Sequence, residues 1–192
     1  MTSSLLLLAG AAGLALGLAA CSETSESSPH NTSPVSQEGP IVVQVEGGAV
    51  EGYRKDGASA FLGIPYAAPP TGERRWRAPE PHAGWSEPLI ATVRPKACPQ
   101  VVPILGAIGV EDCLFLNVHA PDPMPEKKAP VMVWIHGGGF TLGEGVQTDG
   151  GTMGERIAAR TGTLVVSMNY RLGALGFLAH SALSAENGAA VA

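Results

Sequence analysis

The stretch VMVWIHGGGFTLGEG, residues 131–145, decides the fold class of this chain, which has 192 residues. The apolar run over residues 129–136 is typical of a strand that is buried on both faces of a sheet, and a glycine-rich loop follows it. Residues 151–161 then have helical spacing and end at Gly162, a common helix stop. Residues 163–170 form a second apolar run. A strand, a helix and a strand of these lengths predict a βαβ unit with a right-handed crossover, so the predicted fold class is α/β.

Shorter strands are expected upstream of this unit. Residues 41–45 and 49–53 are apolar segments on either side of Gly47-Gly48, which predicts a hairpin. Another strand starts at residues 60–63 and gives way to a loop rich in proline, which cannot donate to a sheet ladder. Residues 113–120 are read as a further strand. The chain therefore predicts a mostly parallel sheet that is preceded by a short antiparallel N-terminal hairpin.

The N-terminus has the pattern of an export signal. Residues 5–20 form an apolar run that is short for a membrane span and suits the core of a signal peptide. The run ends at LAAC, residues 18–21, which resembles a bacterial lipobox. We therefore expect a signal peptide over residues 1–20 and lipidation of Cys21. The opening MTSS lacks the Lys or Arg expected ahead of the apolar run, so ordinary signal cleavage and a misassigned start codon stay open.

Residues 21–39 are polar, contain proline and show no periodicity, which predicts a flexible, lipid-anchored tether. Lipid chains would hold the protein at a membrane surface without a spanning segment. The predicted location is the outer face of a bacterial cell membrane, as a lipoprotein, or the secreted fraction. The folded domain is expected over residues 40–192.

The charge of the chain argues against nucleic acid as a partner. The net charge is -5, and no run of Lys or Arg is longer than Lys127-Lys128. Binding to phosphates needs clustered positive charge, which this chain does not have.

Two of the three cysteines, Cys98 and Cys113, remain once Cys21 is assigned to processing. In an exported protein such a pair favours a disulfide over two free thiols. A metal site is not expected, because no further Cys or His lies near the pair at ligand spacing. The sequence predicts no cofactor.

The glycine loop has several possible uses. A phosphate-binding P-loop would need a Lys after the glycines, but none lies between Lys128 and the end of the chain. A dinucleotide fingerprint would need a third Gly where Leu142 stands. What remains is an oxyanion loop of the HGGG type, in which bare backbone approaches a substrate oxygen, or a tight turn whose glycines only permit positive φ.

At this point the sequence resembles the type-B carboxylesterase family, the cholinesterase and para-nitrobenzyl-esterase group of α/β-hydrolases. EDCLFLNV is the most specific block, because it combines an acidic pair, a cysteine and a strand. The resemblance implies that residues 40–192 are the N-terminal part of an α/β-hydrolase domain. It rests on ordered blocks, which are FLGIPYAAPPTGERRWRAPEP (61–81), CPQ (98–100), EDCLFLNV (111–118), VMVWIHGGGF (131–140) and VVSMNYRLGALGFL (165–178).

The resemblance also implies roles for particular residues. Gly138 and Gly139 would supply two N–H groups of an oxyanion hole, and neither should tolerate a side chain in the space that the acyl group must occupy. His136 would position the loop, and we do not expect it to transfer protons. Two structural pairs are implied as well, the disulfide Cys98–Cys113 and a buried salt bridge Arg75–Glu111.

A nucleophile is missing from this pattern. Acyl transfer through an acyl-enzyme conventionally needs a Ser in a GxSxG turn together with a base and an acid, and no Ser of this chain has that context. We therefore expect a carboxylic ester hydrolase by family, with small-molecule carboxylic esters as partners, but an apparently truncated chain that is inactive alone. The alternatives are a non-catalytic cholinesterase-like interaction protein and a decayed gene product.

The same absence gives an expectation about the sheet. In the α/β-hydrolase order the nucleophile-bearing strand lies beside residues 131–136. Without that neighbour, this apolar strand should become an exposed edge and a template for aggregation.

Overall fold

The computed structural model describes residues 38–146 and 152–187 of the chain. The predicted signal peptide, Cys21 and nearly all of the tether lie outside these residues. Among the helices of the described part, none is long and apolar enough to span a membrane.

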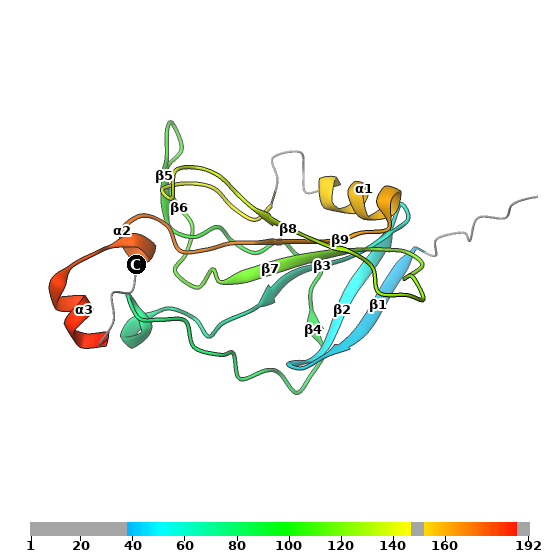
Figure 1. Ribbon diagram of the computed structural model, residues 1–192, viewed down its shortest axis with the longest axis horizontal. Coiled ribbons are helices and arrows are strands. Elements are labelled where there is room, and N and C mark those ends of the chain that lie inside the picture. The colour runs from blue at the N-terminus through cyan, green and yellow to red at the C-terminus, as the bar shows by residue number, and fades with distance from the viewer. Residues whose placement is uncertain (1–37, 147–151, 188–192) are drawn as a thin grey trace, which may run out of the picture. The chain divides into compact units, whose positions relative to one another are not determined.

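A seven-stranded sheet forms the centre of the described part (Figure 1). Its strands run in the order β1-β2-β3-β7-β9-β8, and β4 pairs with β2 beside this path. The strands are β1 (Gly39–Val45), β2 (Gly48–Lys55), β3 (Ala58–Pro65), β4 (Leu89–Ile90), β7 (Phe115–Pro121), β8 (Val131–Ile135) and β9 (Leu164–Met168).

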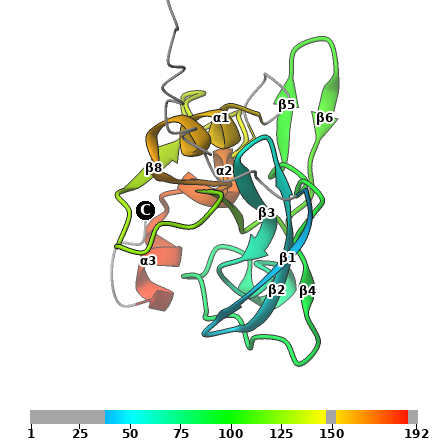
Figure 2. The same cartoon turned by 90° about the vertical axis from the view of Figure 1, so that its right-hand side faces the viewer.

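The other elements are short. A separate hairpin pairs β5 (Gln100–Val102) with β6 (Gly106–Ile108), and Figure 2 shows it extending away from the large sheet. The sequence reading did not find this hairpin. The helices are η1 (Gly72–Arg74), α1 (Thr152–Thr161), α2 (Gly173–Phe177) and α3 (Ser181–Asn187).

The predicted N-terminal hairpin is confirmed. β1 and β2 pair antiparallel from Gly39 opposite Arg54 to Val45 opposite Gly48. The turn lies against Trp85, whose indole Nε1 donates to the Ala49 carbonyl. A Cβ at Gly48 would come within 2.8 Å of the indole ring and within 2.6 Å of the Trp85 carbonyl oxygen, so only glycine fits this turn without a shift.

The predicted βαβ unit is confirmed as well. β8 and β9 pair in parallel, with Val131 opposite Leu164 and Ile135 opposite Met168. The connecting helix α1 packs against β7, β3 and β9. The helix ends where predicted, because Gly162 has a φ of +68° and its N–H bonds the Ala158 carbonyl at 3.0 Å.

The expectation of a mostly parallel sheet is wrong for the described residues. The sheet is mixed, because β1–β2, β2–β3, β3–β7 and β7–β9 are all antiparallel. The first two connections are tight turns, which can join only antiparallel strands. Among the long strands, only β8 and β9 are joined through a helix, and that connection makes them parallel.

The strand β8 does not have the environment that its composition predicts. A strand buried on both faces was expected, but β8 is the last strand of the sheet. Val131 is 60% exposed, Val133 54% and Ile135 66%. Within the described residues no strand pairs with the outer edge of β8, so the predicted exposed apolar edge is confirmed for this part of the chain.

Candidate active site

The glycine loop follows directly on β8 and forms a tight turn. Gly138 has a φ of +118° and Gly139 a φ of +60°. The Gly138 carbonyl accepts hydrogen bonds from the N–H of Thr141 at 3.1 Å and of Leu142 at 3.2 Å. Within the part of the chain that the structure describes, the N–H groups of Gly138 and Gly139 donate no hydrogen bond. Both donors are therefore available to a ligand.

The two glycines are bare for different reasons. A Cβ at Gly138 would collide with the Leu142 carbonyl, so the loop's own backbone excludes a side chain there. The expectation that Gly138 tolerates no side chain thus has a reason within the loop itself, whereas its relation to an acyl group stays a prediction. A Cβ at Gly139 would meet no heavy atom within 4 Å, so the space beside Gly139 is open. At Gly139 the positive φ disfavours other residues, and the open space is the place where a ligand could approach.

His136 lies at the base of the loop. Its ring stacks on Tyr170 with centroids 4.2 Å apart and an angle of 9° between the planes. Nδ1 lies 2.8 Å from the Gly137 carbonyl, and the Tyr170 hydroxyl donates to the His136 carbonyl at 2.7 Å. Because Nδ1 faces a carbonyl, it carries the proton in the neutral ring. These contacts fix the ring between the strand end and the loop, which suits a positioning role.

Two buried asparagines hold the far end of the loop. The Gly145 N–H donates to Asn169 Oδ1 at 2.7 Å, and Asn117 Nδ2 donates to the Gly145 carbonyl at 3.3 Å. Asn169 also donates to the Lys96 carbonyl at 3.0 Å. The two side chains are only 2% and 1% exposed. Sequence reasoning missed both residues, although Asn117 lies within β7 and Asn169 directly follows the apolar strand β9.

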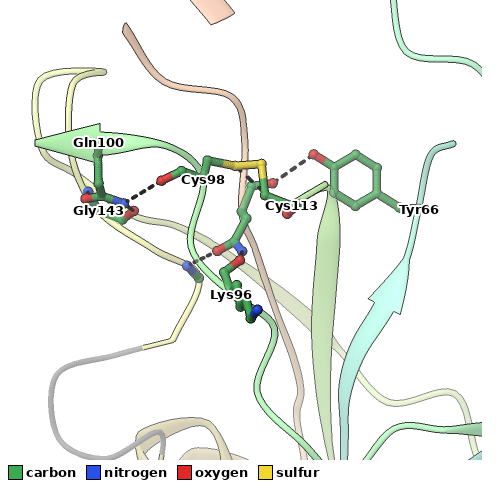
Figure 3. The surroundings of a disulfide bond; sticks show 8 residues. Tyr66, Lys96, Cys98, Gln100, Cys113 and Gly143 are labelled. Atoms are coloured by element: carbon green, nitrogen blue, oxygen red, sulfur yellow. Dashed lines mark hydrogen bonds between the residues drawn. A yellow bond between two sulfur atoms is a disulfide. The ribbon is translucent and has the colours of Figure 1, made fainter. Parts of the chain in front are cut away.

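The disulfide lies close to the loop (Figure 3). Cys98 and Cys113 form a bond with an S–S distance of 1.98 Å across a separation of 15 residues. Both cysteines are buried in one cluster with Leu114, Leu172 and Ala67. Closing a loop of this length stabilises a fold by about 3 kcal/mol in the chain-entropy model.

Arg75 and Glu111 also form the implied ion pair. Arg75 Nε lies 2.7 Å from Glu111 Oε2, and Nη2 lies 2.6 Å from Oε1, so the contact is bidentate. The pair was expected to be buried, but the side chains are 41% and 28% exposed. Because solvent screens exposed ion pairs, this pair fixes geometry at the surface and adds little stability.

A groove of about 640 Å³ opens beside the glycine loop. Trp134, His136 and Gly137 line it from the strand end, and Leu142, Gly143 and Glu144 from the loop. Its lining is mainly apolar, as is typical of a pocket for an organic ligand. Within the described residues no cluster of three or more His, Cys, Asp or Glu side chains could hold a metal ion.

The architecture and the loop together define the N-terminal part of an α/β-hydrolase fold, with a tight glycine turn after a parallel strand. The model of the carboxylesterase family matches residues 39–189, and the chain belongs to this family.

Comparison with known proteins supports this assignment. The chain is 44% identical over 145 residues to para-nitrobenzyl esterase of Bacillus subtilis (strain 168), and the match covers 71% of this chain and 29% of that protein. It is 41% identical over 153 residues to fumonisin B1 esterase of Sphingopyxis macrogoltabida, and the match covers 77% of this chain and 27% of that protein. It is 44% identical over 148 residues to phenmedipham hydrolase of Pseudarthrobacter oxydans, covering 72% and 29%. The chain therefore spans less than a third of the length of these relatives.

Solved structures agree. A para-nitrobenzyl esterase structure superposes with a TM-score of 0.69 at 43% identity, covering 78% of this chain and 31% of the other. A thermophilic para-nitrobenzyl esterase superposes with a TM-score of 0.68 at 41% identity and the same coverage.

Proposed function

We propose that this chain supplies the oxyanion-binding half of a carboxylic ester hydrolase. The observation that carries the proposal is that the N–H groups of Gly138 and Gly139 have no partner among the described residues, in a turn fixed at both ends. When an ester carbonyl is attacked, its oxygen becomes negative in a tetrahedral intermediate. N–H donors that are already in place stabilise this charge, and removal of one donor typically costs about 2.7–4 kcal/mol.

The chain itself cannot complete the reaction. The attacking group would be a Ser in a GxSxG turn, assisted by a base and an acid, and the residue after that Ser would supply a third donor. No Ser of the 192 residues has this context. We therefore expect the chain alone to be catalytically inert, and to contribute binding of the carbonyl oxygen when a polypeptide with the nucleophile completes the domain.

The substrate class follows from the same geometry. Two neighbouring N–H donors that converge on one oxygen would suit a carboxylic ester of a small molecule. The relatives are named for para-nitrobenzyl esters, fumonisin B1 and phenmedipham. Two of these names specify an esterase and the third a hydrolase, so they support ester hydrolysis as a class and do not select one substrate.

Export and membrane attachment are part of the proposal. The apolar run and the lipobox-like LAAC at residues 18–21 support a lipid anchor on Cys21 at the outer face of a bacterial membrane. Labelled fatty acid should enter the chain in cells and should not enter the Cys21→Ala variant. Equal labelling of the two would exclude this anchor.

Hydrolysis of para-nitrophenyl acetate tests the oxyanion role. The purified chain should show no hydrolysis above background. Co-folded with the part of the Bacillus subtilis relative that follows the matched region, it should gain activity, and Gly139→Val should reduce kcat by about 10²–10³.

Gly72→Val is the matched control. Gly72 has a φ of +57° and no heavy atom within 4 Å of an added Cβ, as Gly139 has at +60°. The two substitutions therefore impose similar backbone strain, and only the one in the loop should reduce kcat to that extent. Hydrolysis by the chain alone that is lost in Gly139→Val would contradict the expected inertness, and an active co-folded Gly139→Val protein would contradict the oxyanion role.

A further inference from the structure

Gln100 holds the glycine loop through its side-chain amide. The Gly143 N–H donates to Gln100 Oε1 at 2.8 Å, and Gln100 Nε2 donates to the Gly143 carbonyl at 2.9 Å. The side chain therefore binds both polar groups of one residue, in the way that a neighbouring strand would. Nε2 also donates to the Cys98 carbonyl at 3.1 Å, so both of its hydrogens are used. Figure 3 shows the Gln100 side chain directed at Gly143, with a further bond to Cys98.

Gln100 is itself fixed from two sides. It is the first residue of β5, where it lies opposite Ile108 of β6. Two residues before it, Cys98 is tied to Cys113 by the disulfide. The backbone around Cys98 is packed closely, since a Cβ at Gly109 would collide with the Cys98 carbonyl. The disulfide and the β5–β6 pairing thus hold the backbone of Gln100 in place, and the side-chain amide of Gln100 reaches the loop from this fixed position.

Gly143 in turn determines the position of the oxyanion donors. It has a φ of +124°, and a Cβ there would collide with His136 Nδ1, so the loop folds back tightly on the His136 ring. The preceding residue, Leu142, donates its N–H to the Gly138 carbonyl at 3.2 Å. The Leu142 carbonyl also lies against the Cα of Gly138, where a side chain would not fit. A displacement of Gly143 would therefore be passed directly to Gly138.

We propose that Gln100 is a positioning residue for ester hydrolysis. Its amide holds Gly143 and so sets the direction of the Gly138 and Gly139 N–H groups, with the disulfide Cys98–Cys113 as its brace. This inference rests on the proposed function, because the direction of these N–H groups matters to the reaction only if they bind the ester oxygen. A preorganised donor is effective only when the surrounding residues hold it within a fraction of an ångström of the productive geometry.

Amide hydrogen exchange and ¹H–¹⁵N spectra of the full chain test the proposal. Gln100→Leu keeps the bulk of the side chain and removes its polar atoms. The Gly143 amide, whose acceptor is Gln100 Oε1, should exchange about five- to tenfold faster in this variant. The resonances of Gly138 and Gly139 should shift at the same time. Gln44→Leu is the control, because Gln44 is exposed on β1 and the substitution is the same.

The brace is tested by combining substitutions. Cys98→Ala with Cys113→Ala should also accelerate exchange of the Gly143 amide. If the disulfide acts through Gln100, adding Gln100→Leu to this variant should change the rate by less than it does in the wild-type chain. Full additivity of the two effects on the exchange rate would show that the disulfide does not act through Gln100.

Gln100→Glu provides a second, pH-dependent readout. Its ionised carboxylate can accept from the Gly143 N–H but cannot donate to the Gly143 or Cys98 carbonyl. Below the ordinary carboxyl pKa of about 4.3, the protonated group regains one donor. Exchange of the Gly143 amide, corrected for the intrinsic effect of pH, should then slow in this variant and stay unchanged in the wild type.

Several results would overturn the inference. One is an unchanged Gly143 exchange rate in Gln100→Leu. Another is an equal acceleration of all amides in the sheet, since that would show only a loss of global stability. A third is unmoved Gly138 and Gly139 resonances. None of these measurements requires ester hydrolysis, so failure of the Gln100 role and failure of the proposed function would appear in separate experiments.

Discussion

The neighbouring strands β8 and β9 have similar compositions and opposite environments. VMVWI and LVVSM pair in parallel over their whole length. β9 lies between β7 and β8 and alternates between buried and half-buried residues, with Val165 only 3% exposed. Among the described strands β8 has a neighbour on one side only, and four of its five residues are exposed. The apolar composition of a strand thus indicates that it is suited to burial. Whether the strand is buried depends on the elements that lie beside it.

The contrast extends to the loop after β8. An exposed edge strand would be a poor support for a precise site if the loop depended on it. The loop is instead held from the buried side of the molecule, by Asn169 and Tyr170 just after β9, by Asn117 on β7 and by Gln100 on β5. The position of the Gly138 and Gly139 N–H groups therefore does not depend on burial of β8.

The same substitution made in each strand should reveal the difference between β8 and β9 most clearly, as a difference in the free energy of unfolding. Val165→Ala removes two methyl groups from the covered side of β9 and should lower the free energy of unfolding by about 2 kcal/mol. Val133→Ala, on β8, should change it by less than about 0.5 kcal/mol, because the side chain is already 54% exposed. Urea unfolding followed by circular dichroism measures both. Equal losses would show that β8 is covered in solution.

The difference between β8 and β9 also marks the limit of the sequence reading. The hairpin at Gly47-Gly48 and the helix stop at Gly162 were predictable because each depends on the local conformation of a glycine. The polar contacts of the loop were not, because Gln100 and Gly143 are 43 residues apart and nothing local pairs them. The burial expected for residues 129–136 was wrong since it required a strand that the described residues do not contain. The roles of Gly138 and Gly139 stay predictions.

The covered face beside β9 should give the chain a dependence on pH. His119 lies opposite Val165 in the β7–β9 pairing and is only 6% exposed. Burial lowers its pKa from the ordinary 6.5, although the Glu155 carboxylate partly opposes this shift. The unfolded chain therefore binds a proton at a higher pH than the folded chain does. Stability should be complete above about pH 6.5 and should fall as the pH drops toward the lowered pKa of the folded state.

Unfolding at a series of pH values tests this expectation. His119→Gln cannot take up the proton, so the decrease in stability between pH 6.5 and 5 should be smaller in this variant. His180→Gln is the control, because His180 is exposed on the segment between α2 and α3. Identical pH profiles for the wild type and His119→Gln would rule out His119 as the source.

A charged substitution on β8 should have the smallest effect on stability. Val133→Lys places a charge on an exposed edge strand, where its side chain meets water, so the free energy of unfolding should change by less than about 0.5 kcal/mol. Self-association should decrease, since a charge on an edge strand opposes pairing with another sheet. Sedimentation velocity over a range of concentrations measures the association. The same substitution at Val165 should unfold the chain, because the buried charge has no partner there. Unchanged association of Val133→Lys together with a folded Val165→Lys would contradict this comparison. It would show that β8 is not the exposed edge and that Val165 of β9 is not buried in solution.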